Sequence, residues 1–438
     1  MIMLIIILFI DLFLLNRFNY NDTYKQKFLN LFLIFNLIII LLSYFDSNLY
    51  KVSNKAYMFY LLYVLIICFT ITIFSNKSKS ANANLDELKS KLNYLTSTKY
   101  IKILSTFTFL LLLFYYYKFI NFSKNIGDSS VIRSMYYTNF FKNNFEAYFY
   151  NLILGSLKSN ISLLVAMQLS LNSKKNYFFY IGIIITILSS LIGNGRMSLF
   201  NFMLYAIIMY VTHANKKLKN IEFNKILKLV FLLVLVFFFS LIPLYNRLNY
   251  SNFWIAIPKL INIQFNSIVN YFIGGFRNLD IYLAKKFYTI KSYTYGRATF
   301  GGIDELLCLF LNFIGIRCNS YNGLVVNIMQ NPNRIGINSY FNAFYTCIMN
   351  FYSDLGLFGI IIYSFLFGLV TILLFKKYQK KHKIFDLALL LYFLVNILIS
   401  AVYRWYFQSA SVTFTFFVIY FLSMKEDKIF KNTQINDN

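Results

Sequence analysis

The sequence predicts an all-α, polytopic integral membrane protein with about eleven transmembrane helices. The first observation is composition, because 58% of the 438 residues are apolar and only 13% are charged. Soluble domains carry roughly 25% charged residues, and a disordered chain needs low hydrophobicity. The second observation is that the apolar residues fall in long runs. The third is that basic residues are concentrated in alternate connections between those runs.

Each span is predicted from a run of mostly apolar residues, since a helix needs about 20 of them to cross a bilayer. The predicted spans are 1–15, 28–45, 56–75, 102–120, 147–170, 177–191, 197–212, 227–244, 355–375, 384–403 and 409–423. The first run lacks a basic n-region and an A-x-A cleavage site, so we interpret it as a span and not as a signal peptide.

The basic residues orient these spans, because cytoplasmic loops of membrane proteins carry an excess of Lys and Arg. With the N-terminus outside, every segment that falls inside is basic. These segments are 16–27, 76–101, 171–176, 213–226, 376–383 and 424–438. One span more or fewer would break the alternation, so we expect the N-terminus outside and the C-terminus inside. The net charge of +26 is then mostly an orientation signal and indicates no nucleic-acid partner.

The predicted organisation has four parts: eight spans in 1–244, a large extracytoplasmic loop at 245–339, three spans in 340–424 and a cytoplasmic tail at 425–438. Within the loop, 303–316 (IDELLCLFLNFIGI) is apolar but short for a span. We expect an interfacial or re-entrant helix there.

The four cysteines form no CxxC motif, so neither a zinc site nor a disulfide scaffold is indicated. For Cys308 and Cys318, packing is favoured over pairing.

The arginines do not follow the cytoplasmic excess of basic residues that orients the spans. Only Arg17 falls inside, whereas eight fall outside or at the outer membrane boundary: Arg133, Arg196, Arg247, Arg277, Arg297, Arg317, Arg334 and Arg404. The planar fork of arginine binds phosphate or carboxylate bidentately. The set therefore indicates an anionic ligand that approaches from outside, with pairing to lipid phosphates as the alternative.

Three short motifs place polar groups at the outer surface. Gly193–Arg196 (GNGR) forms a tight outward turn that holds Arg196 at the membrane edge, although a snorkelling arginine would look alike. Asp354 lies at the outer entry of the ninth span, where it can cap the helix or accept a proton from a sugar hydroxyl. Arg404, in YRWY between the last two spans, is a second candidate phosphate ligand.

Tyrosine and asparagine are abundant in the large loop, as in 291–297 (KSYTYGR). Tyrosine rings with a hydroxyl and asparagine amides suit the binding of sugars. Both histidines, His213 and His382, fall inside, so an outward site has no histidine base or metal ligand. No P-loop, dinucleotide fingerprint, GxSxG or HExxH motif is present.

With these motifs the chain resembles the bacterial oligosaccharide repeat-unit polymerases, the Wzy family of O-antigen and capsule polymerases. The resemblance rests on the many spans, on the large outer loop late in the sequence and on two local patterns. One is the turn at Gly193–Arg196 after Ser189 and Ser190. The other is the pattern formed by Tyr352, Asp354, Gly356 and Gly359.

The resemblance implies transfer of a growing glycan from undecaprenyl diphosphate to a new lipid-linked repeat unit. This reaction takes place at the outer face of the bacterial cytoplasmic membrane. It implies no metal or other cofactor, and its partners are membrane lipid and a protein that regulates chain length. The expected catalytic residues are Arg196, Asp354 and Arg404, with Asp304 or Glu305 as a second choice of base. The expected substrate-binding residues are Arg247, Arg277, Tyr295, Arg297, Arg334, Asn338 and Tyr352.

Two alternatives remain open. An O-antigen ligase-like glycosyltransferase has similar spans, but such ligases are associated with a loop histidine that this chain lacks outside. A flippase or other transporter of lipid-linked oligosaccharides favours charges within spans and internal repeats. The interior charges here are few, namely Asp11, Lys158 and Asp386, and no clear repeat is present.

Overall fold

The computed structural model is, over the residues that it describes, all-helical apart from one very short pair of strands. It describes residues 9–10, 12, 23–45, 49–74, 85–126, 132, 135–136, 139–192, 197–213, 238, 241–242, 244–245, 248, 252–289, 292–321, 333–337, 340–341, 346–400 and 406–436. Contacts divide the chain into two compact units. The first contains Met1–Ala81, Ser267–Lys381 and Phe393–Phe416, and the second contains Asn82–Asn266, His382–Tyr392 and Phe417–Asn438.

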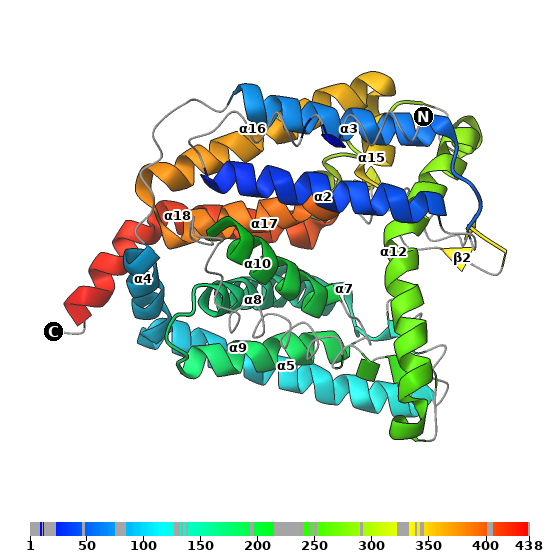
Figure 1. Cartoon of the computed structure of the whole chain (residues 1–438). Helices are drawn as coiled ribbons and strands as arrows, with labels where there is room; N and C mark the ends of the chain where they lie inside the picture. Colours follow the sequence, from blue (N-terminus) through cyan, green and yellow to red (C-terminus); the bar gives the residue numbers. More distant parts are fainter. Residues whose placement is uncertain are drawn as a thin grey trace. The chain divides into compact units, whose positions relative to one another are not determined.

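The first unit is built around a pair of long apolar helices, α3 (Asn54–Ile73) and α16 (Leu357–Lys381), which pack along each other (Figure 1). Gly368 allows this close approach, because a Cβ built there would lie 2.8 Å from the Cβ of Thr70 on α3. A small residue at such a position on a helix face lets the neighbouring helix approach closely. The unit also contains α2 (Thr23–Phe45), α13 (Gly301–Phe313), α15 (Cys347–Leu355), η4 (Tyr406–Gln408), β1 (Asn333–Arg334) and β2 (Tyr340–Phe341).

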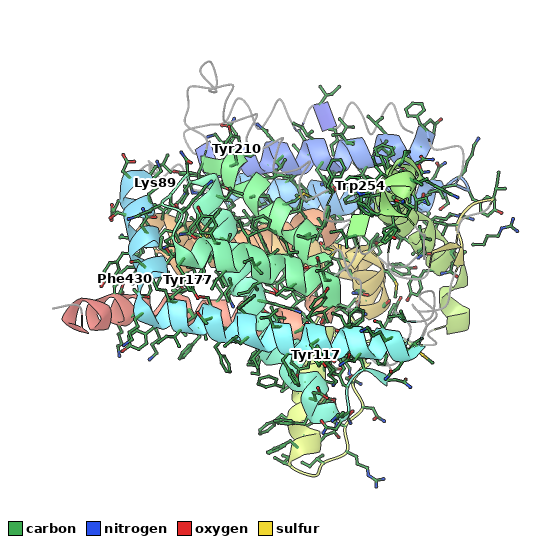
Figure 2. All side chains as sticks on the ribbon, turned by 90° about the horizontal axis from the view of Figure 1, so that it is seen from below. Lys89, Tyr117, Tyr177, Tyr210, Trp254 and Phe430 are labelled. Atoms are coloured by element: carbon green, nitrogen blue, oxygen red, sulfur yellow. A yellow bond between two sulfur atoms is a disulfide. The ribbon has the colours of Figure 1, made fainter. Side chains whose placement is uncertain are left out.

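The second unit is a layered set of helices in which α5 packs on α9, α9 on α8 and α8 on α10. Its helices are α4 (Leu85–Ser97), α5 (Lys99–Ile126), α7 (Asn144–Tyr148), the π-helical turn η1 (Phe149–Leu154), α8 (Gly155–Ser170), α9 (Tyr177–Leu191) and α10 (Met197–His213). Figure 2 shows Tyr117 on α5 and Tyr177 at the start of α9, and both rings are exposed. The Tyr177 hydroxyl lies 3.0 Å from that of Thr106, which links α9 to α5.

Three helices continue from one unit into the other: α12 (Phe253–Thr289), α17 (Ile384–Ser400) and α18 (Ala410–Asn436). The long helix α12 falls within the predicted extracytoplasmic loop, so much of that segment is helical. Its polar residues, among them Asn262, Gln264 and Asn270, interrupt the apolar run. This explains why composition predicted a loop there.

Five of the described helices are long and apolar enough to cross a membrane: Tyr24–Phe45, Asn54–Ile73, Lys99–Ile126, Asn144–Ser170 and Leu357–Lys381. Three shorter apolar helices are Tyr177–Leu191, Met197–His213 and Ile384–Ser400. All eight overlap predicted spans. Of the remaining three, 1–15 and 227–244 lie almost entirely outside the described residues, and all of 409–423 except Ser409 falls within α18. The count of eleven and the orientation stay predictions.

Two local expectations were wrong. Asp354 does not cap the ninth span, because it lies in the last turn of α15, and α16 begins only after the turn at Gly356. Cys308 and Cys318 form a disulfide. The chain turns back after α13, and the side-chain amide of Asn312 bonds both backbone groups of Cys318 at 2.9 Å, which brings the two cysteines together.

Candidate functional site

Three segments of the first unit that are distant in sequence meet at Tyr50. The Tyr50 backbone N–H donates to the Ile335 carbonyl at 2.9 Å, and Leu49 pairs with Gly336 as an antiparallel bridge. Leu49 and Ile335 are buried together with Ile273 of α12. This small apolar core joins the loop before α3, the helix α12 and the strand β1. In the predicted orientation all three segments face outside.

Two of the predicted substrate-binding arginines lie against the Tyr50 ring. The guanidinium carbon of Arg277 is 5.8 Å from the ring centroid, and that of Arg334 is 6.0 Å from it. Both distances are within the range of a cation–π interaction. We call Tyr50, Lys51, Arg277, Asp280 and Arg334 the Tyr50 cluster.

The Tyr50 cluster carries more positive than negative charge. Arg277 forms an ion pair with Asp280, and its Nη1 also donates to the Lys51 carbonyl at 3.3 Å. Arg334 donates to the carbonyls of Gly336 and Ile337 at 3.3 and 2.8 Å, and within the described part of the chain it forms no ion pair. Hydrogen bonds to neutral carbonyl groups leave the positive charge of Arg334 uncompensated. The Tyr50 cluster can therefore bind an anion.

A second group forms around Asp354, which is fully buried. Its carboxylate accepts the Thr294 hydroxyl, the Ala298 N–H at 3.0 Å and the Thr299 N–H at 2.8 Å. These bonds fix the turn that leads into α13. A carboxylate enclosed in this way anchors that turn, and its part in proton transfer stays a prediction.

Arg297 is also committed to protein contacts. Its Nε and Nη2 donate to the two carboxylate oxygens of Asp304 at 2.9 and 3.3 Å, and Nη2 donates to the Asn319 carbonyl at 3.1 Å. The Tyr321 N–H bonds Asp304 at 2.6 Å, and the Tyr321 ring lies 5.7 Å from the guanidinium. Burial, reinforced by the charge of Asp354, raises the pKa of the Tyr321 hydroxyl to about 12. That hydroxyl therefore stays neutral at physiological pH.

The two predicted tyrosines have different environments. Tyr295 is 77% exposed and has a left-handed backbone (φ 48°), next to Gly296 in the turn before α13. A tyrosine held outward in this way can stack on a sugar. Tyr352 instead packs its ring 5.4 Å from that of Phe59 on α3, so its part in substrate binding stays a prediction.

Four predicted site residues, Arg196, Arg247, Arg404 and Asn338, lie outside the described residues. In the part that is described, sequence reasoning missed Tyr50, Lys51 and Asp280. Tyr50 and Lys51 occupy a short connection between two spans and belong to no motif. Only the pairing of residues 49–50 with 335–336 gives them a role, and no local pattern predicts it.

Comparison with protein-family models, with curated proteins and with solved structures finds no match for the chain. Among the described residues, no group of three or more His, Cys, Asp or Glu side chains is arranged to hold a metal ion.

Proposed function

We propose that the chain polymerises undecaprenyl-diphosphate-linked oligosaccharide repeat units into a surface polysaccharide, at the outer face of the bacterial cytoplasmic membrane. The observation that supports this best is the pair of arginines at the Tyr50 ring, in segments that the orientation rule places outside. The five helices that are long enough to cross a membrane agree with a lipid-borne substrate.

In this reaction the acceptor hydroxyl of one repeat unit attacks the anomeric carbon of the growing glycan. The bond from that carbon to the diphosphate oxygen breaks, and negative charge develops on the leaving diphosphate. Arg277 and Arg334 stabilise this charge, which is the largest single contribution that a site of this kind makes. The acceptor proton passes to a carboxylate, and Asp280 is the one that belongs to the Tyr50 cluster.

The charged residues within predicted spans give the transporter alternative little support. The ammonium group of Lys158 lies 4.7 Å from the centroid of the Tyr150 ring, and Asp386 accepts the Ser423 hydroxyl. Both side chains thus have partners within the second unit. For the ligase alternative, neither His213 nor His382 falls outside in the predicted orientation.

The test uses full-length purified protein in detergent and lipid-linked repeat units extracted from a strain that lacks this protein. No nucleotide sugar, ATP or divalent metal is added. We expect a product ladder with steps of one repeat unit, and we expect Arg334→Ala to slow its formation roughly a hundredfold. Lys142→Ala, which removes a predicted outer charge in the second unit, is the matched control.

A ladder that is unaffected by Arg334→Ala would leave polymerisation standing and remove the Tyr50 cluster from it. Absence of a ladder from folded protein would contradict polymerisation. Flipping of the same lipid in sealed vesicles would then favour a transporter, and transfer to a lipid A core acceptor would favour a ligase.

A further inference from the structure

The helix α13 presents a continuous apolar stripe that the described residues leave uncovered. Ile303, Leu307, Phe310 and Ile314 recur at helical spacing, and all four side chains are exposed. Phe313, at the end of the helix, is 88% exposed. A contiguous face of five exposed apolar side chains is unusual on the aqueous surface of a protein and marks a site of interaction.

The tip beyond this stripe is held in one shape. The Cys308–Cys318 disulfide ties the helix to the returning chain, and the Asn312 amide bonds both the N–H and the carbonyl of Cys318. Gly315 makes the turn with a left-handed backbone (φ 86°). Phe313, Ile314 and Ile316 are thereby presented together as a fixed apolar tip.

The other end of α13 is attached to the beginning of α18. The Glu305 carboxylate accepts the Ala410 N–H at 3.1 Å. Gly302 packs so closely that a Cβ would lie 2.5 Å from the Ser409 carbonyl oxygen. The predicted last span starts at this point, so α13 begins at the level of the outer membrane boundary.

We propose that α13 docks its apolar stripe and tip into the outer leaflet of the phospholipid bilayer, at the boundary between headgroups and acyl chains. A helix of this length spans about 20 Å, too short for the roughly 30 Å hydrocarbon core. Asn312 and Arg317 at the tip belong in the headgroup layer. A disulfide forms on the oxidising side of the membrane, which agrees with the outer leaflet.

The charged residues beside the apolar stripe of α13 favour lipid over a protein as its binding partner. The exposed Arg317 follows the apolar tip directly, and arginine beside an apolar face binds lipid phosphates. The two acids of the helix are turned to internal partners, Asp304 to Arg297 and Glu305 to the Ala410 N–H. This docking would hold whatever reaction the Tyr50 cluster performs.

The test places a single tryptophan at the tip of the full-length chain in phosphatidylcholine–phosphatidylglycerol vesicles. The native Trp254, at the start of α12 (Figure 2), and Trp405 are replaced by phenylalanine. Phe313→Trp then reports on the tip, with Leu307→Trp as a second reporter in case the first variant fails to fold. Tyr295→Trp, exposed on the turn before α13, is the matched control.

We expect lipids brominated near the headgroups to quench tryptophan at positions 313 and 307, and to quench more than lipids brominated near the chain ends. The control at position 295 should not be quenched. Stronger quenching by the deep bromines would overturn the proposal in favour of a re-entrant helix. Blue-shifted emission without quenching would overturn it in favour of a protein partner, and water-like emission without quenching would rule out docking.

Discussion

At the residue scale, the Tyr50 ring lies next to two positive charges. Two arginines against one ring repel each other, and Asp280 compensates only one of them directly. The ring quadrupole offsets part of the remainder. A diphosphate would neutralise the remaining positive charge. Its binding is therefore favoured by two guanidinium groups that the folded chain already holds in place.

Replacing the ring should therefore weaken binding more than it weakens folding. The ring positions both guanidinium groups through these contacts, so Tyr50→Leu should let the arginines move away from the site and raise the apparent Km for the lipid-linked repeat unit roughly tenfold. Tyr50→Phe keeps the ring and should behave like wild type. The measurement is the rate of ladder formation against substrate concentration. Equal losses in both variants would show that the hydroxyl matters and that the cation–π account is wrong.

Asp354 gives a second prediction, because a structural anchor and a general base respond differently to Asp354→Asn. An asparagine keeps one acceptor oxygen and leaves one of three donors unpaired, which costs about 1–3 kcal/mol. We expect a lower melting temperature and faster proteolysis within 292–300. The exposed Asp86 provides the control variant, Asp86→Asn. Unchanged stability with lost polymerisation would instead assign Asp354 to proton transfer.

These residues show what the sequence can and cannot predict. Arg277 and Arg334 were selected as candidate outward cations from residue type and predicted orientation, and the structure places both against the Tyr50 ring. Their common partner Tyr50 was not selected, since it depends on a backbone pairing across most of the chain. Asp354 was selected as a candidate base, but its hydrogen bonds to residues 294–299 depend on a contact that no spacing in the sequence reveals.

At the element scale, the hairpin formed by α13 and residues 314–321 depends on its disulfide. A disulfide between cysteines ten positions apart in the sequence stabilises the fold by about 2–3 kcal/mol through loop closure. Cys318→Ser should therefore loosen the tip while α16 and α3 stay folded. Hydrogen exchange should rise at 309–320 and remain unchanged at 357–375. The buried free cysteine Cys68 offers a control, Cys68→Ser, which should leave exchange at 309–320 unchanged.

The turn between α16 and α17 makes a pH-dependent prediction. Burial, aided by Lys91, lowers the pKa of the His382 imidazole, while Glu87 acts against the shift. The folded state then binds fewer protons than the unfolded state, so this contribution to stability is present above the unfolded pKa of about 6.5 and is lost as pH falls.

His382→Asn should remove that dependence without disturbing the turn. His382 has a left-handed backbone (φ 47°), and asparagine tolerates this conformation well. The melting temperature of wild type should fall between pH 7 and pH 5 by more than that of the variant. Parallel curves would show that His382 is not responsible.

At the scale of the whole molecule, the helical part was predicted more reliably than the large loop. Long apolar runs leave few alternatives to a helix, and eight predicted spans coincide with apolar helices. Between residues 245 and 339, apolar and polar residues mix, and hydropathy no longer distinguishes a loop from α12. The order of spans predicts neither the bridge at Leu49 nor the contact of α13 with α18, because both join segments far apart in the chain.

The orientation on which the proposed function depends can be tested directly with single cysteines. The four native cysteines are replaced by serine, and Lys142→Cys and Lys428→Cys are introduced separately at exposed positions. A maleimide that cannot cross the membrane should label position 142 in intact spheroplasts and position 428 only after permeabilisation. The reason is that eleven spans with the N-terminus outside put the basic tail in the cytoplasm. The reverse labelling would turn the Tyr50 cluster toward the cytoplasm, and polymerisation at the outer face would then have no site on this chain.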